Sequence, residues 1–192
     1  LFPEDSLKYK NIVSKGIPNL DSKFVSNYSK KTKIVRPSVL DLNYLYTRSF
    51  YIKNYPHSQK ADSLVQLQLK QCKEDWLTYS LYEKGLLALI MNRFKEKDFA
   101  KKIITSLKET VSSNDEIGMY WIENTSSYGW YQSDIATQAL LIEAFAEIDK
   151  DKETIDAMKV WLIKNKQTNR WSTTKSTSEA VYALMSQGSD WF

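Results

Sequence analysis

Two distant stretches of the chain carry the same pattern, and this pattern decides the fold. Residues 128–145 read YGWYQSDIATQALLIEAF, and residues 169–185 read NRWSTTKSTSEAVYALM. Each stretch contains a tryptophan, then a small polar pair, then an apolar run that begins with alanine, all in the same register. A pattern that recurs within one chain indicates an architecture of repeated structural units.

A third copy of the pattern lies upstream, where residues 76–90 read WLTYSLYEKGLLALI. Alignment of the three copies superimposes three tryptophans and, nine residues later, three small residues: Trp76, Trp130 and Trp171, followed by Gly85, Ala139 and Ala180. The spacing between the copies is irregular but of the size expected when each repeat is a pair of helices. We therefore predict that the tryptophans take equivalent, buried places at the starts of three helices.

The apolar runs that follow these small residues predict buried helices. Residues 86–91 are apolar without interruption, and residues 139–146 are interrupted only by Glu143. A helix that is apolar nearly all round is a buried one. We call these the inner helices. A capping box of Ser176 and Glu179 predicts the start of the last of them.

Ser38 and Asp41, just after Pro37, predict an earlier inner helix that continues to about Phe50. The segments between the inner helices show one apolar stripe at helical spacing, with Lys, Glu and Gln opposite, so we interpret them as outer helices. Their stripes are Ala61, Val65, Leu69 and Cys72; Phe99, Ile103 and Leu107; and Ile155, Met158 and Leu162. Alternating inner and outer helices predict an all-α fold, either an open solenoid or a closed ring of hairpins.

Composition excludes several classes of function. The chain has 192 residues, a formal net charge of +4, one cysteine and one histidine. The lysines are scattered, and the one dense run, residues 29–33, is typical of a solvated segment, so we predict no nucleic-acid partner. No apolar stretch is long enough to span a membrane, and one cysteine excludes an intrachain disulfide. The chain opens without a methionine or a signal peptide, which is consistent with a segment of a longer protein.

Three phrases of the sequence resemble a known family. They are GMYWIENTSSYGWYQSDIATQALLIEAF, VWLIKNKQTNRWSTTKSTSEAVYALM and LDLNYLYTRSF. They look like the later part of the α/α-toroid domain of bacterial α2-macroglobulin-like proteins, especially those of Bacteroides-type organisms. The resemblance covers residues 38–192 and leaves residues 1–37 as an unassigned lead-in.

The resemblance implies an α/α toroid, here a partial or incomplete ring, in a periplasmic or cell-envelope protease trap. Such an endopeptidase inhibitor is cut in a bait region and closes around the protease. The implied partners are the target protease and the neighbouring domains of the same polypeptide. The segment itself is expected to be non-catalytic.

The toroid of that family carries a thioester formed by a Cys-x-Glu-Gln motif. Here the nearest match is Cys72-Lys73-Glu74-Asp75, in which an aspartate replaces the glutamine that supplies the acyl group. Cys72 also lies on an outer-helix stripe, so we predict a buried structural thiol and no thioester in this chain. A thioester upstream of Leu1 is left open.

Other chemistry lacks the residues it needs. His57, in a loop after Pro56, is expected to be solvated, and we predict no metal site, cofactor or phosphate loop. One alternative is a carbohydrate-active toroid enzyme, a lyase or glycosidase, with Glu123 and Asp134 as its carboxylate pair. The other is a helical scaffold for protein contacts.

An aromatic loop runs from Met119 to Tyr131 and predicts a small β-hairpin around residues 124–127. Tyrosine and tryptophan suit the docking of a partner, and they suit equally the closure of one mouth of a toroid. The candidate partner-binding residues are Trp121, Tyr128 and Tyr131. We predict that Trp130 is buried, because it occupies the repeat position, and that Trp121 is partly exposed.

Overall fold

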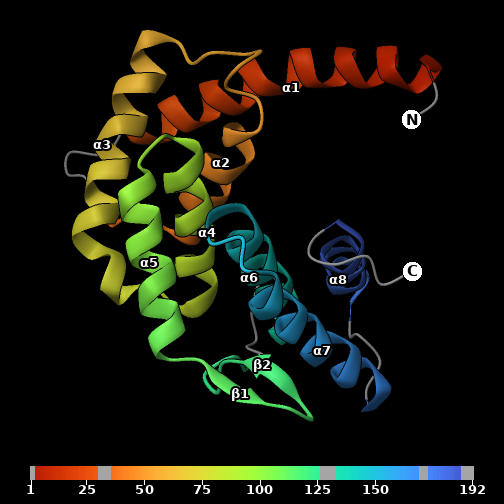
Figure 1. Ribbon diagram of the computed structural model, residues 1–192. Helices are drawn as coiled ribbons and strands as arrows, with labels where there is room; N and C mark the ends of the chain where they lie inside the picture. Colours follow the sequence, from red (N-terminus) through yellow and green to blue (C-terminus); the bar gives the residue numbers. More distant parts are fainter. Residues whose placement is uncertain (1–2, 30–35, 126–132, 169–172, 187–192) are drawn as a thin grey trace. The chain divides into compact units, whose positions relative to one another are not determined.

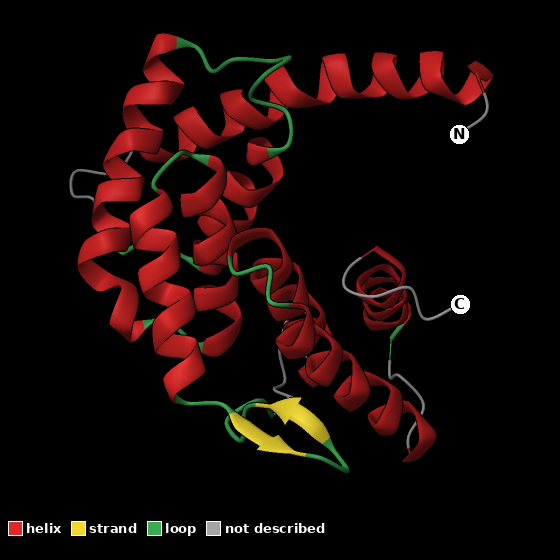
Figure 2. Cartoon of the chain, viewed as in Figure 1, coloured by secondary structure: helices red, strands yellow, loops and turns green. Residues whose placement is uncertain are grey.

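The computed structural model describes residues 3–29, 36–125, 133–168 and 173–186 (Figure 1). Within these residues the chain is mostly helical, with eight α-helices and one two-stranded antiparallel sheet (Figure 2), so the all-α prediction is confirmed. The helices are α1 Pro3–Ser29, α2 Val39–Ser49, α3 Gln59–Asp75, α4 Leu81–Arg93, α5 Lys97–Glu109, α6 Asp134–Ile148, α7 Lys152–Thr168 and α8 Thr174–Ser186. The chain divides into an N-terminal unit, Leu1–Leu77, and a C-terminal unit, Thr78–Phe192.

In the N-terminal unit α1 packs against both α2 and α3. Its buried residues include Phe24, whose ring stacks on that of Tyr44 with centroids 3.9 Å apart. The stripe predicted for α3 is buried in full, so both its outer-helix pattern and the burial of Cys72 are confirmed. The sequence pattern left residues 1–37 unassigned, and α1 is an addition that only the structure reveals.

A buried ion pair joins α1 to α2. The Arg48 guanidinium, which is inaccessible to solvent, donates from Nε to Asp21 Oδ1 at 2.7 Å and from Nη2 to the carbonyl of Tyr55 at 2.8 Å. The Tyr44 hydroxyl donates to the same Asp21 oxygen at 2.8 Å. Burial, followed by the bond to Asp21, raises the pKa of Tyr44 well above its ordinary value, so the phenol stays neutral.

In the C-terminal unit α6 is the central helix and contacts α4, α5, α7 and α8. Every residue from Ile135 to Phe145 is buried, and so is every residue from Gly85 to Met91 of α4. The prediction that these two runs form buried helices is confirmed. The predicted stripes of α5 and α7 are buried, except that Phe99 is only half-buried. The opposite face is exposed in α5 as predicted, whereas α7 also buries Lys159 and Trp161 and is exposed only toward its ends.

Small residues set how closely the inner helices approach. A Cβ atom added to Gly85 would lie 3.1 Å from Leu141 Cδ2, so α4 and α6 pack closely there. Ala139 and Ala180 are buried at the corresponding places of α6 and α8. Trp76 is also buried, but it lies at the C-cap of α3 rather than at the start of α4. Trp130 and Trp171 lie outside the described residues.

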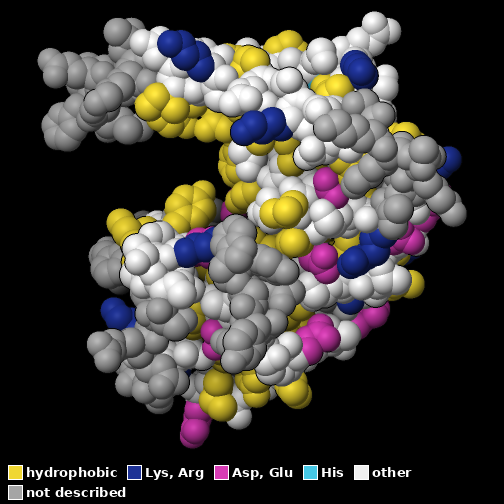
Figure 3. Space-filling view, turned by 180° about the vertical axis from the view of Figure 1, so that it is seen from behind, with side chains coloured by type: hydrophobic (Ala, Val, Ile, Leu, Met, Phe, Trp, Pro, Cys, Tyr) yellow, Lys and Arg dark blue, Asp and Glu magenta, His cyan; other side chains and the backbone are white. Residues whose placement is uncertain are grey.

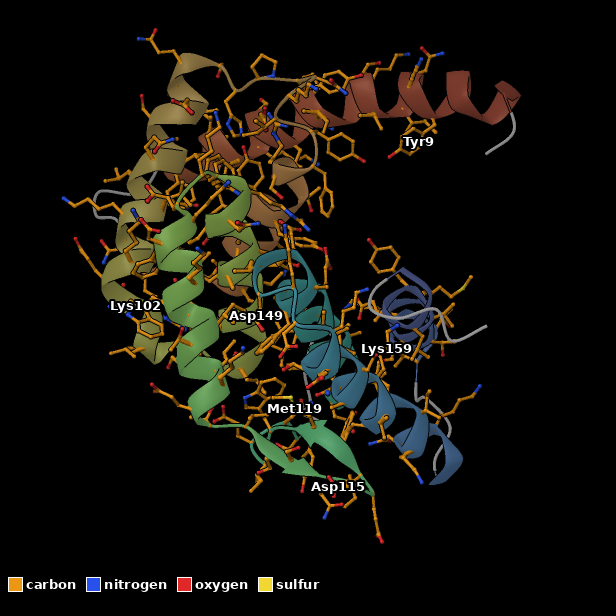
Figure 4. All side chains as sticks on the ribbon, viewed as in Figure 1. Tyr9, Lys102, Asp115, Met119, Asp149 and Lys159 are labelled. Atoms are coloured by element: carbon orange, nitrogen blue, oxygen red, sulfur yellow. The ribbon has the colours of Figure 1, made fainter. Side chains whose placement is uncertain are left out.

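One contact ties α8 to α7, and another caps its N-terminal end. The buried Lys159 of α7 (Figure 4) donates from Nζ to the carbonyl of Leu184 at 3.1 Å. At the other end of α8 the backbone N–H of Ser176 donates to Thr173 Oγ1 at 3.1 Å. The prediction that Ser176 and Glu179 form a capping box is therefore wrong, because Thr173 supplies the hydroxyl one turn earlier. Glu179 instead pairs with Lys175 at 2.7 Å.

The capping box predicted at the start of α2 is confirmed, since Ser38 and Asp41 bond to each other's backbone. A second capping box, formed by Ser80 and Glu83, begins α4 and was missed. Both boxes satisfy backbone N–H groups that a helix start leaves unpaired.

A β-hairpin lies earlier in the chain than the one predicted around residues 124–127, whose second half lies outside the described residues. Strand β1, Ser112–Asn114, pairs with β2, Gly118–Tyr120, whereas the aromatic pattern suggested a turn around residues 124–127. Asn114 Oδ1 closes the actual turn by accepting from the backbone N–H groups of Glu116 and Ile117. Gly118 has a φ of 88° and packs so tightly against α7 that a Cβ atom would collide with the carbonyl of Ala157.

Candidate functional site

The candidate site is the segment from Met119 to Thr125 and the adjacent N-terminal ends of α4 and α6. The buried Gln138 of α6 anchors this segment by donating from Nε2 to the carbonyls of Met119, at 2.8 Å, and Met158, at 3.3 Å. Tyr120 stacks on Trp161 of α7, with ring centroids 6.3 Å apart. Met119 (Figure 4) and its hairpin are therefore held against α6 and α7.

Trp121 is buried, with only 1% of its surface exposed, so the prediction of a partly exposed ring is wrong. Its indole N–H donates to the carbonyl of Leu107 at the end of α5, at 2.9 Å. Its ring meets that of Phe145 edge to face, with centroids 5.8 Å apart. An indole with a satisfied N–H and two packed faces offers no surface for stacking on a ligand.

The remaining aromatic candidates, Tyr128, Trp130 and Tyr131, lie outside the described residues, so their roles stay predictions. Among the described residues of this segment, Ile122 is the large apolar side chain that faces solvent. The sequence pattern did not single out Ile122, because a single apolar residue between a tryptophan and a glutamate forms no periodic pattern.

A small hollow of about 160 Å³ lies beside this segment. It is lined by Ser80, Leu81, Tyr82, Glu123, Asn124, Thr125 and Thr137. Burial raises the pKa of Tyr82 to about 12, with a smaller contribution from Glu179, so its hydroxyl is a neutral hydrogen-bonding group. The hollow is smaller than the sites that hold drug-sized ligands, which are roughly 300–1,000 Å³.

The two predicted carboxylates take different places. Glu123 lines the hollow and is exposed. Asp134 begins α6, is not among the lining residues, and accepts from the backbone N–H of Ile135 at 3.0 Å. Its carbonyl accepts from Asn124 Nδ2 at 2.9 Å, which ties the segment to α6. The hollow therefore presents one carboxylate, whereas glycoside hydrolysis uses a pair.

Polar groups at the helix ends join the inner helices to one another. At the N-terminal ends, the hydroxyls of Ser133 and Ser176 lie 2.7 Å apart and connect α6 to α8. At the C-terminal end of α4, Arg93 bonds to Glu143 at 2.6 Å and to Glu147 at 2.6 Å. Burial alone would lower the pKa of Arg93, but its bonds to Glu147 and Glu143 outweigh this effect and raise it. Glu143, the one break in the apolar run of α6, thus serves to clamp α6 to α4.

His57 lies in the N-terminal unit, and the expectation that it is solvated is wrong. Only 2% of its side chain is exposed, and its Nδ1 lies 4.0 Å from Asp62 Oδ1. Burial lowers its pKa, and the nearby Arg48 charge lowers it further, against the weaker opposite effects of Asp21 and Asp62. The imidazole is therefore neutral near pH 7.

Three broader findings bear on the site. Among the described residues, no group of three or more His, Cys, Asp or Glu side chains could hold a metal ion. None of the helices in the same ranges combines the length and the apolar character needed to cross a membrane. Comparison of the chain with protein-family models, with curated proteins and with solved structures gave no match.

Proposed function

We propose that this chain is the later part of an α/α-toroid domain in a bacterial α2-macroglobulin-like protease trap, and that its role is non-catalytic. The proposal rests on the resemblance of the three phrases around Leu45, Trp130 and Trp171. The structural observation that best supports it is the order of helices in the C-terminal unit. There α6 contacts both α4 and α8, while α5 and α7 return the chain between them (Figure 1).

That order is what an arc of helical hairpins requires. Each hairpin contributes one inner and one outer helix, and successive inner helices pack side by side. The buried runs of α4 and α6 fit the inner layer, and the one-sided stripe of α5 fits the outer layer. A partial ring is the finer arrangement that we propose for residues 38–192.

The domain acts in this proposal as a rigid body. A trap closes around its protease by displacement of whole domains after the bait region is cut. Three contacts would keep the C-terminal unit intact during that movement. They are the ion pairs of Arg93 with Glu143 and Glu147, the hydrogen bond of Gln138 to Met119, and the packing of Trp121. In this proposal the protein works in the periplasm or cell envelope.

The chain contributes no thioester in this proposal. Cys72 is fully buried on α3, and its motif ends in Asp75 rather than glutamine. Treatment of the native protein with methylamine should leave its mass unchanged, and a thiol reagent should modify Cys72 only after unfolding. Rapid labelling of the native protein, or incorporation of methylamine, would contradict this part of the proposal.

The function can be tested with the intact protein and an active protease such as trypsin. A trap encloses the protease, so hydrolysis of casein should fall while hydrolysis of a short chromogenic peptide continues. Trypsin inactivated at its catalytic serine is the control, because it cannot cut the bait and should not be retained. Equal loss of both activities would indicate an ordinary active-site inhibitor, and no loss of either would refute the trap.

The two alternatives make different predictions. A carbohydrate-active enzyme should turn over a glycan and lose that activity in Glu123→Gln or Asp134→Asn. A helical scaffold should bind its partner whether or not a protease has acted. We place the trap first because the hollow beside Glu123 presents one carboxylate and little volume.

A further inference from the structure

A tyrosine-lined groove runs along α1 in the N-terminal unit. One hollow, of about 630 Å³, lies between residues 9–14 of α1 and the segment that follows α2. A second hollow, of about 510 Å³, continues along α1 as far as Val25. The two share Asn54 and Tyr55, so they form one elongated groove. Figure 3 shows hydrophobic side chains gathered along one edge of α1.

A hydrogen bond between two tyrosines joins α1 to the segment after α2 and holds the aromatic side chains of the groove in place. The hydroxyls of Tyr9, on α1, and Tyr51, after α2, lie 2.7 Å apart and form a hydrogen bond. Tyr9 projects from α1 (Figure 4) and is 55% exposed, while Tyr51 is half-buried. A ring that is fixed through its hydroxyl and still exposed keeps one face open for stacking.

The opposite wall is also ordered before any ligand binds. The backbone N–H of Tyr55 donates to the carbonyl of Tyr51 at 2.8 Å, which closes a turn. The carbonyl of Tyr55 in turn accepts from Arg48 Nη2 at 2.8 Å. The turn is thus bonded to a buried guanidinium, and this order lowers the entropic cost of binding.

Two carboxamides lie beside the rings with their hydrogen-bonding groups unused. Asn11 comes from α1 and Asn54 from the turn, and neither side chain bonds to another described residue. Each carboxamide offers two donor hydrogens and an acceptor oxygen. Of the residues that line the first hollow, Lys10 is the charged one. The second hollow has two charged residues among its described lining, the exposed Lys60 and Asp21, and Asp21 is already engaged by Arg48 and Tyr44.

We propose that this groove binds a neutral oligosaccharide chain. The apolar face of a sugar ring can stack on an open tyrosine ring, while adjacent hydroxyls, which both donate and accept, can bond to the carboxamides. A proline-rich peptide also docks on aromatic grooves, but it would leave most of the donors of Asn11 and Asn54 unused. The length of the groove favours a chain of sugars over a single one. This proposal does not rest on the protease-trap function.

The test is native gel electrophoresis of the protein through gels that contain soluble starch, xylan, mixed-linkage β-glucan or glucomannan. At least one polysaccharide should retard the protein, and titration calorimetry with the matching tetrasaccharide then gives an affinity. Tyr9→Ala and Asn54→Ala should each weaken binding by roughly tenfold or more. Tyr9→Phe, which keeps the ring and loses the hydroxyl, should bind more tightly than Tyr9→Ala.

Tyr182→Ala is the matched control, because Tyr182 is 53% exposed, close to the 55% of Tyr9, and lies on α8 in the other unit. It should bind like the parent, and circular dichroism should show all variants folded. The absence of retardation by all four polysaccharides would overturn the proposal. So would binding that survives Tyr9→Ala, or binding of decaproline in place of any polysaccharide.

Discussion

The two units of the chain build their interiors from different kinds of contact. In the C-terminal unit, α4 and α6 are buried along uninterrupted runs, and their main polar link, Arg93 to Glu143 and Glu147, lies at the helix ends. In the N-terminal unit, a charged pair, Arg48 and Asp21, lies within the helix packing itself. The C-terminal unit also buries Gln138 and Lys159, but these side chains bond to backbone carbonyls, whereas the buried Arg48 of the N-terminal unit faces a charged side chain.

This difference decides how each unit responds to substitution. Loss of a large apolar side chain leaves a cavity, and its cost grows with the volume removed. Loss of one member of a buried polar pair leaves the other buried without a hydrogen-bond or charge partner, so the cost of removing it from water is no longer offset. The predictions below separate these two responses, and we order them from the largest expected effect.

The largest effect is expected for Phe145→Ala in α6. Phe145 is fully buried and packs against Trp121, so truncation should lower the free energy of unfolding by about 3–5 kcal/mol. Ile122→Ala, an apolar truncation at an exposed position of the same unit, should change it by less than about 0.5 kcal/mol. Urea denaturation measures both, and a loss below about 1 kcal/mol for Phe145→Ala would contradict a volume-dependent core.

The corresponding change in the N-terminal unit is Asp21→Asn. It keeps the shape but removes the negative charge that faces Arg48, so we expect a loss of about 2–3 kcal/mol. In a double-mutant cycle with Arg48→Met, the second change should cost much less once the first is present. If the losses of the two single variants add up in the double variant, Asp21 and Arg48 do not stabilise the fold through their interaction with each other. Asp62→Asn, at an exposed carboxylate, is the control.

These contrasts also explain how far the sequence could predict the fold. Periodicity and local motifs revealed the features that depend on residues close together in the sequence. These features are the buried runs of α4 and α6, the stripes of α3, α5 and α7, and the Ser38 capping box. The repeat register placed Gly85, Ala139 and Ala180 in the core correctly. The register also predicted that Trp76 lies at the start of α4, but in the structure Trp76 lies at the end of α3.

The errors in the candidate site have a common physical cause. The buried Trp121 bonds to a carbonyl at the end of α5 and packs on Phe145 of α6, and the ring of His57 lies near that of Tyr44 of α2. Contacts between residues this far apart leave no local pattern in a single sequence. The helix α1 was missed because it contains Pro18 and its hydrophobic stripe is weak. Its buried residues Ile17, Phe24 and Tyr28 stabilise it through tertiary packing.

A smaller effect is expected when the indole of Trp121 loses its hydrogen bond. Trp121→Phe keeps an aromatic ring against Phe145 but leaves the carbonyl of Leu107 without its donor, so we expect a loss of about 1–2 kcal/mol. The same change at Trp161, which stacks on Tyr120, serves as a comparison. Unchanged stability in Trp121→Phe would show that the bond to Leu107 contributes little.

His57 should give the N-terminal unit a dependence on pH. Its pKa in the folded state lies below its ordinary value of 6.5, chiefly because of burial, so the unfolded chain binds the proton more readily. The contribution of the neutral imidazole is complete above pH 6.5 and is lost as the pH falls below it. The free energy of unfolding should therefore decrease between pH 7.5 and pH 5, and His57→Gln should reduce that slope. An identical slope in the variant would contradict this assignment.

The smallest effect is expected on α8, which carries the same sequence phrase as α6 but a different environment. In the register that aligns Ala180 with Ala139, Met185 corresponds to Ala144, yet Met185 is 73% exposed while Ala144 is fully buried. The reason is that α6 has α4 on one side and α8 on the other, whereas the face of α8 that carries Tyr182 and Met185 is exposed. Met185→Ser should therefore change the free energy of unfolding by less than about 0.5 kcal/mol.

The result for Met185→Ser has a second use, because it shows whether that face is exposed in solution. The measurement should be made at two protein concentrations, since a face covered by a second molecule stabilises the fold in a concentration-dependent way. A loss above about 1 kcal/mol that grows with protein concentration would show that the repeat continues across a contact between molecules. A small loss at both concentrations would confirm that a shared sequence phrase specifies the helix, while the number of neighbouring helices determines its burial.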